Sequence, residues 1–482
     1  MAALDIYKET QLVQKMKQRN RPVRAILNGT ASIRESIDNK NGDSEPSILE
    51  YIKKEEKESK DMYSNRMLRT YITPYLKTAI TSAAGQIFKN PIIIKTKDDI
   101  ALDDRLASVV KNVDLHGSDL NEYLMSDTEE SLSYGMSIAY CGFYNPTSTI
   151  NLSEQISSGA KPFIKLVSYF DILGYNSDNQ GNITMLRFQE ESSIEDEFLG
   201  SDRVTQVRVI TPTTYTVYRE DEKKNGVIYE QGDIIRFDEK GARITDRVPI
   251  EVMYGRKLGT LNAASVFEDM AFINLEHTQV NSDLNWSCHF YLTPFLLTTL
   301  GAEAAGADVD ITPVLASYLN VTLPSGSEIK WVETNGHAQK AGADQLREIE
   351  RRMDSSSMNS NATSSTGKET ATGRAIDASS KSAKLKMHAE AVETYAKNII
   401  KMLASFMPDV TVPEFEVIAN KEFNVSQDNQ TIESLSNMEE KRQISLETML
   451  TELKRRGVLS DDIDIQLEVA KIAEETAADG VI

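Results

Sequence analysis

Residues 364–369, Ser-Ser-Thr-Gly-Lys-Glu, superficially resemble a phosphate-binding loop. Such a loop needs a glycine five residues before its Gly-Lys pair and a Ser or Thr after the lysine, because backbone N–H groups cradle the phosphates and the hydroxyl binds Mg²⁺. The chain has Ala362 and Glu369 at these two positions. The segment therefore does not indicate a nucleotide site.

Residues 135–139, Gly-Met-Ser-Ile-Ala, resemble the nucleophile elbow of hydrolases without its last glycine. The elbow needs a strand before the serine and a helix after it. Here Ser137 begins a predicted strand instead, so the pattern favours a turn serine over a nucleophile.

Histidine and cysteine spacing also fails to predict a site. The triplet at His388 has the His-x-Glu of zinc deaminases, but no Pro-Cys-x-x-Cys follows it. His277 lies on an apolar helical stripe, which predicts a buried or interface histidine. Cys141 and Cys288 have no metal-ligand partners, so we expect two reduced and dispensable thiols. The five histidines are His116, His277, His289, His337 and His388, and none forms a metal-binding pattern. We therefore expect no catalytic residues, no metal, no cofactor and no enzymatic activity.

The chain of 482 residues carries 53 Lys and Arg against 73 Asp and Glu, a net charge of −20. This balance argues against a surface that wraps DNA, although it leaves open a surface past which DNA slides without binding. No apolar run approaches the ~20 residues that span a bilayer, and the N-terminus lacks a secretory signal. We expect a soluble protein of about three domains, or one elongated subunit.

Helical and strand patterns occupy different parts of the chain. The first 34 residues are basic, with seven Lys and Arg against two acids. Residues 54–88 read as two helices, with Pro74 starting or kinking the second. Short strands dominate residues 137–255, interrupted by an acidic stretch, 190–202, which we predict to be a solvated loop. Long helices at 261–290 and 338–353 flank short strands at 295–299, 317–323 and 328–332. Together these patterns predict a mixed α/β (α+β) protein.

A polar segment and a long helix follow. Residues 355–367 have almost no apolar side chains, so we expect a mobile loop. Residues 368–408 predict one helix of ~55 Å with an apolar stripe at alternating spacings of three and four. That length exceeds what one subunit's core accommodates, so the stripe predicts an oligomer interface. The residues assigned to the interface are Ala389, Val392, Ala396 and Ile399. A strand at 414–423 and helices at 434–456 and 462–477 complete the chain.

Four segments resemble portal proteins of tailed bacteriophages, in a subfamily catalogued as a domain of unknown function. They are RTYITPYLKTAITSAAGQIFKNP at 69–91, INLEHTQVNSDLNWSCHFYLTPFLLTTLG at 273–301, GKETATGRAIDASSKSAKL at 367–385 and KRRGVLSDDID at 454–464. Each motif alone is weak, but their order along the chain matches the family. Portal proteins form dodecameric rings at one capsid vertex, through which terminase pumps double-stranded DNA.

The resemblance implies an elongated subunit with a β-rich wing, stem helices, a small α/β clip and a helical crown. The implied divisions are a basic arm (1–45), wing (46–260), stem helix (261–291), clip (292–336), second stem helix (337–358), tunnel loop (359–368), a long helix toward the crown (369–410), and a strand with the crown (411–482). The tunnel loop would face DNA with weak hydrogen bonds and one mobile charge. Its residues are Asn359, Ser360, Asn361, Thr363, Ser364, Ser365, Thr366 and Lys368.

The resemblance also implies the partners: further copies of the chain in a ring of twelve, the terminase large subunit, a head–tail adaptor, major capsid and scaffolding proteins, and the DNA in the channel. The protein would be assembled in the host cytoplasm and reside at the portal vertex of the virion. One alternative stays open, another oligomeric virion or scaffold-associated protein without a channel. An enzyme ranks third, because only the size and the incomplete motifs support it.

Overall fold

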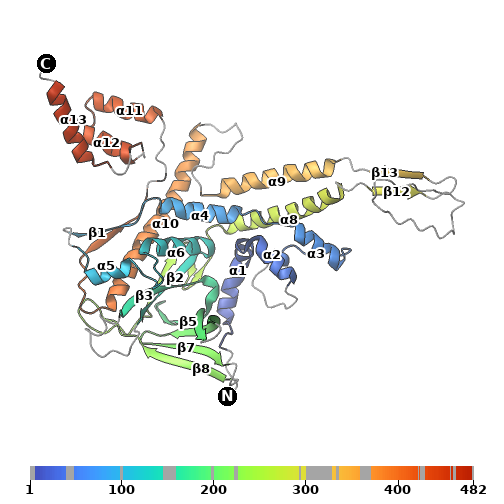
Figure 1. The fold of residues 1–482 in the computed structure, drawn as a ribbon, viewed down its shortest axis with the longest axis horizontal. Helices are drawn as coiled ribbons and strands as arrows, with labels where there is room; N and C mark the ends of the chain where they lie inside the picture. The colour runs from blue at the N-terminus through green and yellow to red at the C-terminus, as the bar shows by residue number, and fades with distance from the viewer. Residues whose placement is uncertain are drawn as a thin grey trace.

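The computed structural model combines a body, a projecting helical stalk and a separate group of C-terminal helices (Figure 1). It describes residues 6–38, 48–97, 101–144, 159–196, 200–221, 226–291, 295–299, 328–332, 336–358, 371–421, 423, 429–455, 458–459 and 463–479. Its helices alternate with antiparallel sheets, so the expected mixed α/β class is confirmed.

The helical elements are α1 (Gln11–Leu27), α2 (Gly29–Asp38), η1 (Ile48–Glu50), α3 (Lys60–Arg69), α4 (Tyr75–Ile87), α5 (Asp104–Val110), α6 (Leu120–Tyr134), η3 (Tyr169–Asp171), α8 (Glu268–Tyr291), α9 (His337–Ser356), α10 (Ala371–Ser405), α11 (Asn429–Glu440), α12 (Leu446–Arg455) and α13 (Ile465–Asp479). The strands are β1 (Ile93–Thr96), β2 (Met136–Tyr144), β3 (Lys161–Val167), β4 (Ile172–Ser177), β5 (Ile183–Asp196), β6 (Gly200–Ile210), β7 (Thr214–Asp221), β8 (Gly226–Asp233), β9 (Ile250–Tyr254), β10 (Lys257–Gly259), β11 (Asn262–Ala263), β12 (Phe295–Thr299), β13 (Glu328–Val332) and β14 (Phe415–Ile418).

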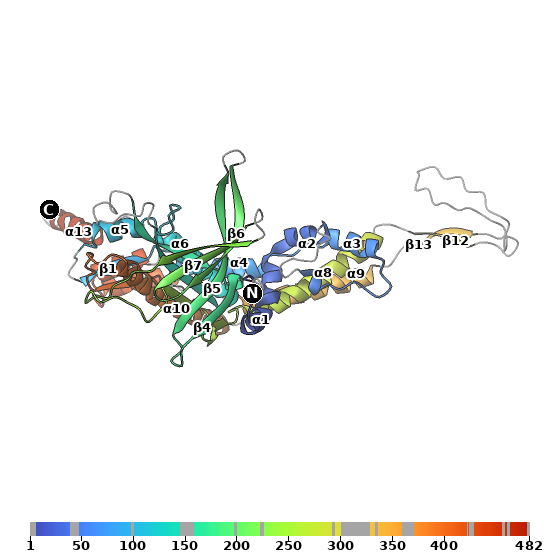
Figure 2. The same cartoon turned by 90° about the horizontal axis from the view of Figure 1, so that it is seen from below.

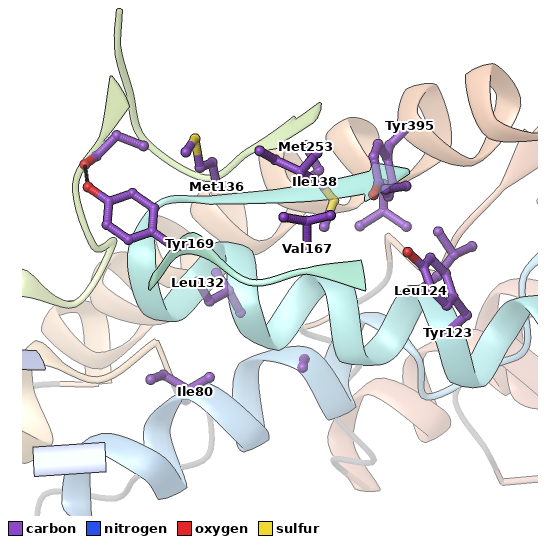
Figure 3. Packing of buried hydrophobic residues seen from close by; sticks show 14 of the residues in the cluster. Ile80, Tyr123, Leu124, Leu132, Met136, Ile138, Val167, Tyr169, Met253 and Tyr395 are labelled. Atoms are coloured by element: carbon purple, nitrogen blue, oxygen red, sulfur yellow. Dashed lines mark hydrogen bonds between the residues drawn. The ribbon is translucent and has the colours of Figure 1, made fainter. Parts of the chain in front are cut away.

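The centre of the body is the sheet β3-β2-β9, packed on α6. Residues Met136 to Cys141 of β2 are all buried, as expected of a central strand covered on both faces. In Figure 3, Leu132 of α6 lies between this sheet and Ile80 of α4. Gly135 ends α6 with a φ of +87°, a conformation that favours glycine. The turn from α6 into β2 thus depends on this residue.

The N-terminal basic segment packs on the body. Thr10 caps α1 by accepting a hydrogen bond from the N–H of Val13, and one face of the helix buries Val13, Met16, Val23 and Ile26. Lys17 is itself buried, where it donates to Glu9 and to the carbonyl of Phe170. The basic composition of this segment therefore includes a cation that the fold encloses.

A second sheet, β4-β5-β6-β7-β8, is an antiparallel meander. It corrects the prediction of a loop at 190–202, because β5 and β6 continue through most of that stretch and pair from Leu186–Ile210 out to Asp196–Gly200. The acidic composition suggested a loop, but backbone pairing between the two strands holds it extended. Upstream of this meander, η3 separates β3 from β4 within the strand-rich region predicted at 137–255.

Helix α10 lies against the body and contacts β9, β14 and α4 (Figure 1). Its predicted oligomer interface was wrong, because the stripe is buried within the single chain. The exposed fractions are 0% for Ala389, 1% for Val392, 0% for Ala396 and 0% for Ile399. Although α10 has 35 residues, elements of the same subunit, including β9, β14 and α4, pack along it and bury these side chains.

The start of α4 and the strand β14 match their predictions, whereas the C-terminal helices differ from theirs. Pro74 directly precedes α4, as predicted. The strand predicted at 414–423 is β14, which pairs with β1. The single helix predicted at 434–456 was wrong: α11 and α12 are separate, with Arg442 at a φ of +56° between them and Ser445 accepting from the N–H of Thr448 at 3.2 Å.

Candidate functional site

Helices α8 and α9 form an antiparallel pair that projects from the body (Figures 1 and 2). Their contacts run in opposite directions along the two sequences: His277 faces Glu350, Leu284 lies beside Gly342, and Ser287 accepts from Gln339 at 3.0 Å. At 1.5 Å per residue, the helices of 24 and 20 residues are about 36 and 30 Å long. We call this pair the stalk.

The stalk ends in the two-stranded sheet of β12 and β13, which pair antiparallel in an unbroken register from Phe295–Val332 to Thr299–Glu328. Both strands match the predicted ranges 295–299 and 328–332. The strand predicted at 317–323 lies outside the described residues. Figure 2 shows this sheet at the end of the molecule farthest from the C-terminal helices.

Helix α8 is fixed to the body by polar contacts. The side chain of Asn274 accepts a hydrogen bond from the N–H of Leu76 at 3.1 Å and donates one to the carbonyl of Thr73 at 3.2 Å. The side chain of Asn281 donates to the carbonyl of Tyr71 at 3.4 Å. Both asparagines are buried. Directional hydrogen bonds define the rotation of a helix more tightly than apolar contact alone, because each leaves an unsatisfied group when it is lost.

A charged joint reinforces α8 from the side of α3. The guanidinium of Arg66 binds both carboxylate oxygens of Glu58 at 2.9 Å and reaches Asp283 of α8 at 3.4 Å. The Arg66 hydrogen bonds lower the pKa of Glu58, so its carboxylate stays ionised in the joint. Thr70 and Ser282 share a further hydrogen bond at 2.8 Å. This joint was not predicted, because Arg66 and Asp283 lie 217 positions apart and share no local pattern.

His277 lies where α4, α8 and α9 meet, and it is buried as predicted. Its Nε2 is 3.4 Å from a Glu350 oxygen, and the ring of Tyr75 packs edge-on at 5.5 Å between centroids. Burial, followed by the charge of Glu350, raises the pKa of Tyr75 to about 12. The arrangement joins three helices through a histidine, a carboxylate and an aromatic ring.

The outer face of α9 carries balanced charge. Arg347 pairs with Asp344 at 2.6 Å and Arg351 with Glu348 at 2.8 Å, each one turn away on the same helix. Arg352 reaches across the stalk to Glu276 at 3.1 Å. Each of these exposed arginines therefore has a carboxylate neighbour, which reduces its attraction for a polyanion.

The predicted DNA-facing residues 359–368 lie outside the described residues. Their flanks are described: α9 continues through Ser356, so the predicted loop start at 355 was too early. Met358, the last described residue of this segment, is 6% exposed and packs in the hydrophobic core. Of the two flanking helices, α9 is part of the stalk and α10 packs against the body.

Two residues of the incomplete sequence motifs, Ser137 and His388, lie in the described part of the chain, whereas residues 364–369 lie outside it. Ser137 is the second residue of β2, close to the strand start predicted there, and its hydroxyl donates to Asp127 at 2.7 Å inside the core. His388 is buried, and burial lowers its pKa. Among the residues that the structure describes, no three His, Cys, Asp or Glu side chains are arranged to hold a metal ion. None of the described helices is both long and apolar enough for a bilayer span.

A family model described as a domain of unknown function, DUF4055, matches residues 266–407. The match begins just before α8 and ends just after α10. The match therefore covers both stalk helices, the sheet at the stalk tip and α10, which together are less than a third of the chain. No curated protein matches the sequence.

Proposed function

We propose that the chain is a portal protein, which forms a ring at one capsid vertex and conducts double-stranded DNA during packaging and ejection. The order of elements supports this proposal. A stalk of two antiparallel helices with a small β tip is inserted between a β-rich body and a long helix that leads to C-terminal helices. This order corresponds to the wing, stem, clip, stem and crown that the sequence resemblance implies.

Side-chain burial in the stalk carries the proposal. Beyond Leu275 of α8 and before Ile349 of α9, no described apolar side chain of the two helices is fully buried. Two helices whose apolar residues are only partly buried along most of their contact gain less stability from one another, because tertiary packing supplies most helical stability. Neighbouring copies packed around the stalk would supply it.

The charge distribution supports a channel that does not retain DNA. The net charge is −20, and the exposed arginines of α9 are paired with carboxylates. Each unpaired Lys or Arg on a channel wall would add a phosphate contact and so increase the affinity for DNA. A neutralised wall lets the duplex slide.

The decisive experiment is electron microscopy of the purified 53.8 kDa chain, with the assembled mass measured in solution. The proposal predicts closed rings with a central opening. Their stalks should lie side by side around it. Filaments or monomers at all concentrations would contradict it. Closed particles without an opening would favour the alternative, a virion or scaffold-associated oligomer without a channel.

The segment between α9 and α10 is part of the same proposal, as the tunnel loop in the lumen. Deleting Asn359 to Ser365 should leave ring assembly unchanged and reduce DNA packaging in assembled heads. Packaging at the wild-type yield would exclude this role. Loss of rings would assign the segment to assembly instead.

A further inference from the structure

His277 of α8 is a buried imidazole whose two ring nitrogens differ in their surroundings. The residue is 3% exposed, and its Nε2 lies 3.4 Å from a carboxylate oxygen of Glu350 on α9. Its Nδ1 has no hydrogen-bond partner within the described chain. Histidine side chains change charge between about pH 5 and 8. Because Nδ1 is without a partner in both charge states, the two states of His277 differ mainly in their interaction with Glu350.

The side of α9 that meets α4 and α8 carries negative charge. Asp354 follows Glu350 by one helical turn, and the ring of Tyr75 on α4 packs edge-on against His277 at 5.5 Å between centroids. Burial, followed by Glu350 and then by the charge of Asp354, raises the pKa of Tyr75 to about 12. Burial and Glu350 also raise the pKa of Asp354, despite the nearby charge of Lys381 on α10. Such a negative potential is the one with which an imidazolium interacts favourably.

The other cations of these helices are engaged elsewhere or point to solvent. Arg352 of α9 pairs with Glu276 of α8 at 3.1 Å, and both side chains are more than a third exposed. Lys77, the one charged residue of α4, is exposed, and α8 itself contains no Lys or Arg. In the part of the chain that the structure describes, the one side chain within ion-pair distance of Glu350 is His277. Its protonation therefore decides whether this carboxylate has a counter-ion.

The two residues lie at the root of the stalk, where α9 returns to the body. Glu350 stands between two buried apolar residues of α9, Ile349 and Met353. The attachment of α8 is different, because Asn274 and Asn281 hold it with amide side chains that do not titrate. The interaction of His277 with Glu350 therefore makes the attachment of α9, and not that of α8, dependent on protons.

We propose that His277 and Glu350 form a proton-operated latch at the root of the stalk. When the imidazole is protonated, its Nε2–H donates to the Glu350 carboxylate in an ion pair, which holds α9 against α8. When the proton leaves to solvent, the attraction between opposite charges is lost and α9 separates from α8 more readily. A charge pair with one buried partner is screened less than the exposed pair of Arg352 and Glu276. The latch belongs to the single subunit and does not rest on the proposed ring.

Hydrogen–deuterium exchange of the full chain at pH 5.5 and 8.0 tests the latch. After correction for the intrinsic exchange rate, amides of residues 346–356 should be about threefold or more better protected at pH 5.5, because they exchange through local opening. His277→Gln keeps a polar side chain that does not titrate, and Glu350→Gln keeps the shape of the acceptor without its charge. Both variants should lose the pH dependence. His116→Gln, at an exposed position, is the matched control and should retain it.

The comparison between variants isolates the latch, because pH effects from elsewhere in the fold are common to all of them. The measurements are made at a concentration where sedimentation gives the same state of association at both pH values. Equal protection of the wild type at the two pH values, or a pH dependence that persists in either variant, would overturn the proposal. If His277→Gln does not fold, Glu350→Gln decides alone, since the Glu350 side chain is 38% exposed.

The latch and the portal proposal fail separately. Rings in which the exchange of residues 346–356 does not depend on pH would exclude the latch and leave the portal proposal intact. A pH dependence that is lost in both variants of a chain that forms no rings would support the latch and contradict the portal.

Discussion

Asp127 gives the most quantitative prediction, because it is a fully buried carboxyl group without a cation beside it in the described chain. It lies in α6, where it accepts from Ser137 of β2 at 2.7 Å and from Tyr395 of α10 at 2.5 Å. Burial raises its pKa from 3.8 to about 7, against the opposing effect of the Tyr395 and Ser137 hydrogen bonds. The group therefore connects three elements of the core through a carboxyl that prefers to be protonated.

The sign of the effect on stability follows from this direction. Between pH 4 and pH 7 the unfolded chain has lost the Asp127 proton and the folded chain retains it, so the free energy of unfolding falls as pH rises. A shift of about three pKa units corresponds to roughly 4 kcal/mol over the whole range, at 1.36 kcal/mol per unit. From pH 5.5 to 7.5, a range that contains the folded group's titration midpoint near 7, the loss is about 2 kcal/mol.

Urea unfolding of the wild type and of Asp127→Asn at pH 5.5 and 7.5 measures this loss. The asparagine keeps an acceptor for Tyr395 or Ser137 but does not titrate. Its stability advantage over the wild type should therefore grow by about 2 kcal/mol between the two pH values. Asp104→Asn, at an exposed position of α5, controls for the loss of one carboxylate. If the wild type and Asp127→Asn had parallel pH profiles, the reasoning would be refuted.

Two further predictions concern packing. Ala396→Glu places a charge at a position of α10 that is 0% exposed and should lower the free energy of unfolding in urea by more than about 3 kcal/mol. Met387→Glu, at a position 56% exposed on the same helix, should change stability little. Equal effects of the two variants would contradict the burial of the stripe. Gly135→Ala should lower the melting temperature, because a φ of +87° alone costs roughly 1–2 kcal/mol and the added Cβ would lie 2.0 Å from the carbonyl oxygen of Ala264. Gly85→Ala in open space on α4 should instead stabilise by up to about 1 kcal/mol, and the same sign for both glycines would be inconsistent with this geometry.

Local signals predicted most of the elements. The β12 and β13 ranges and the helix start after Pro74 follow from β-branched runs and from the fixed φ of proline, which act within a few residues. The acidic stretch at 190–202 was assigned to a loop because charge suggests solvent exposure. Strand pairing does not require apolar side chains when a neighbouring strand supplies the hydrogen bonds, so composition could not distinguish a ribbon from a loop.

Sequence patterns could not reveal which chain fills an apolar stripe. The alternating spacing at Ala389, Val392, Ala396 and Ile399 correctly indicates a buried helix face, but the same pattern serves a core and an interface. In contrast, the stalk carries a weak apolar pattern, and beyond Leu275 its described buried side chains are polar: His277, Thr278, Asn281 and Ser282. The charged joint at Arg66 likewise brings together residues more than 200 positions apart, which no local window contains.

The two helix faces differ in how far they could take part in contacts between copies in the proposed ring. The stripe of α10 is fully used inside the subunit, so a contact there would require unfolding. The stalk has the opposite property, because its direction is set by hydrogen bonds to the body, while beyond Leu275 and before Ile349 none of its described apolar side chains is fully buried. Rotation of α8 is fixed by Asn274 and Asn281, and the pair therefore projects in a defined direction before any partner arrives. In the proposed ring, such a directed but sparsely packed stalk would favour side-by-side packing, because little conformational freedom would remain to be lost on assembly.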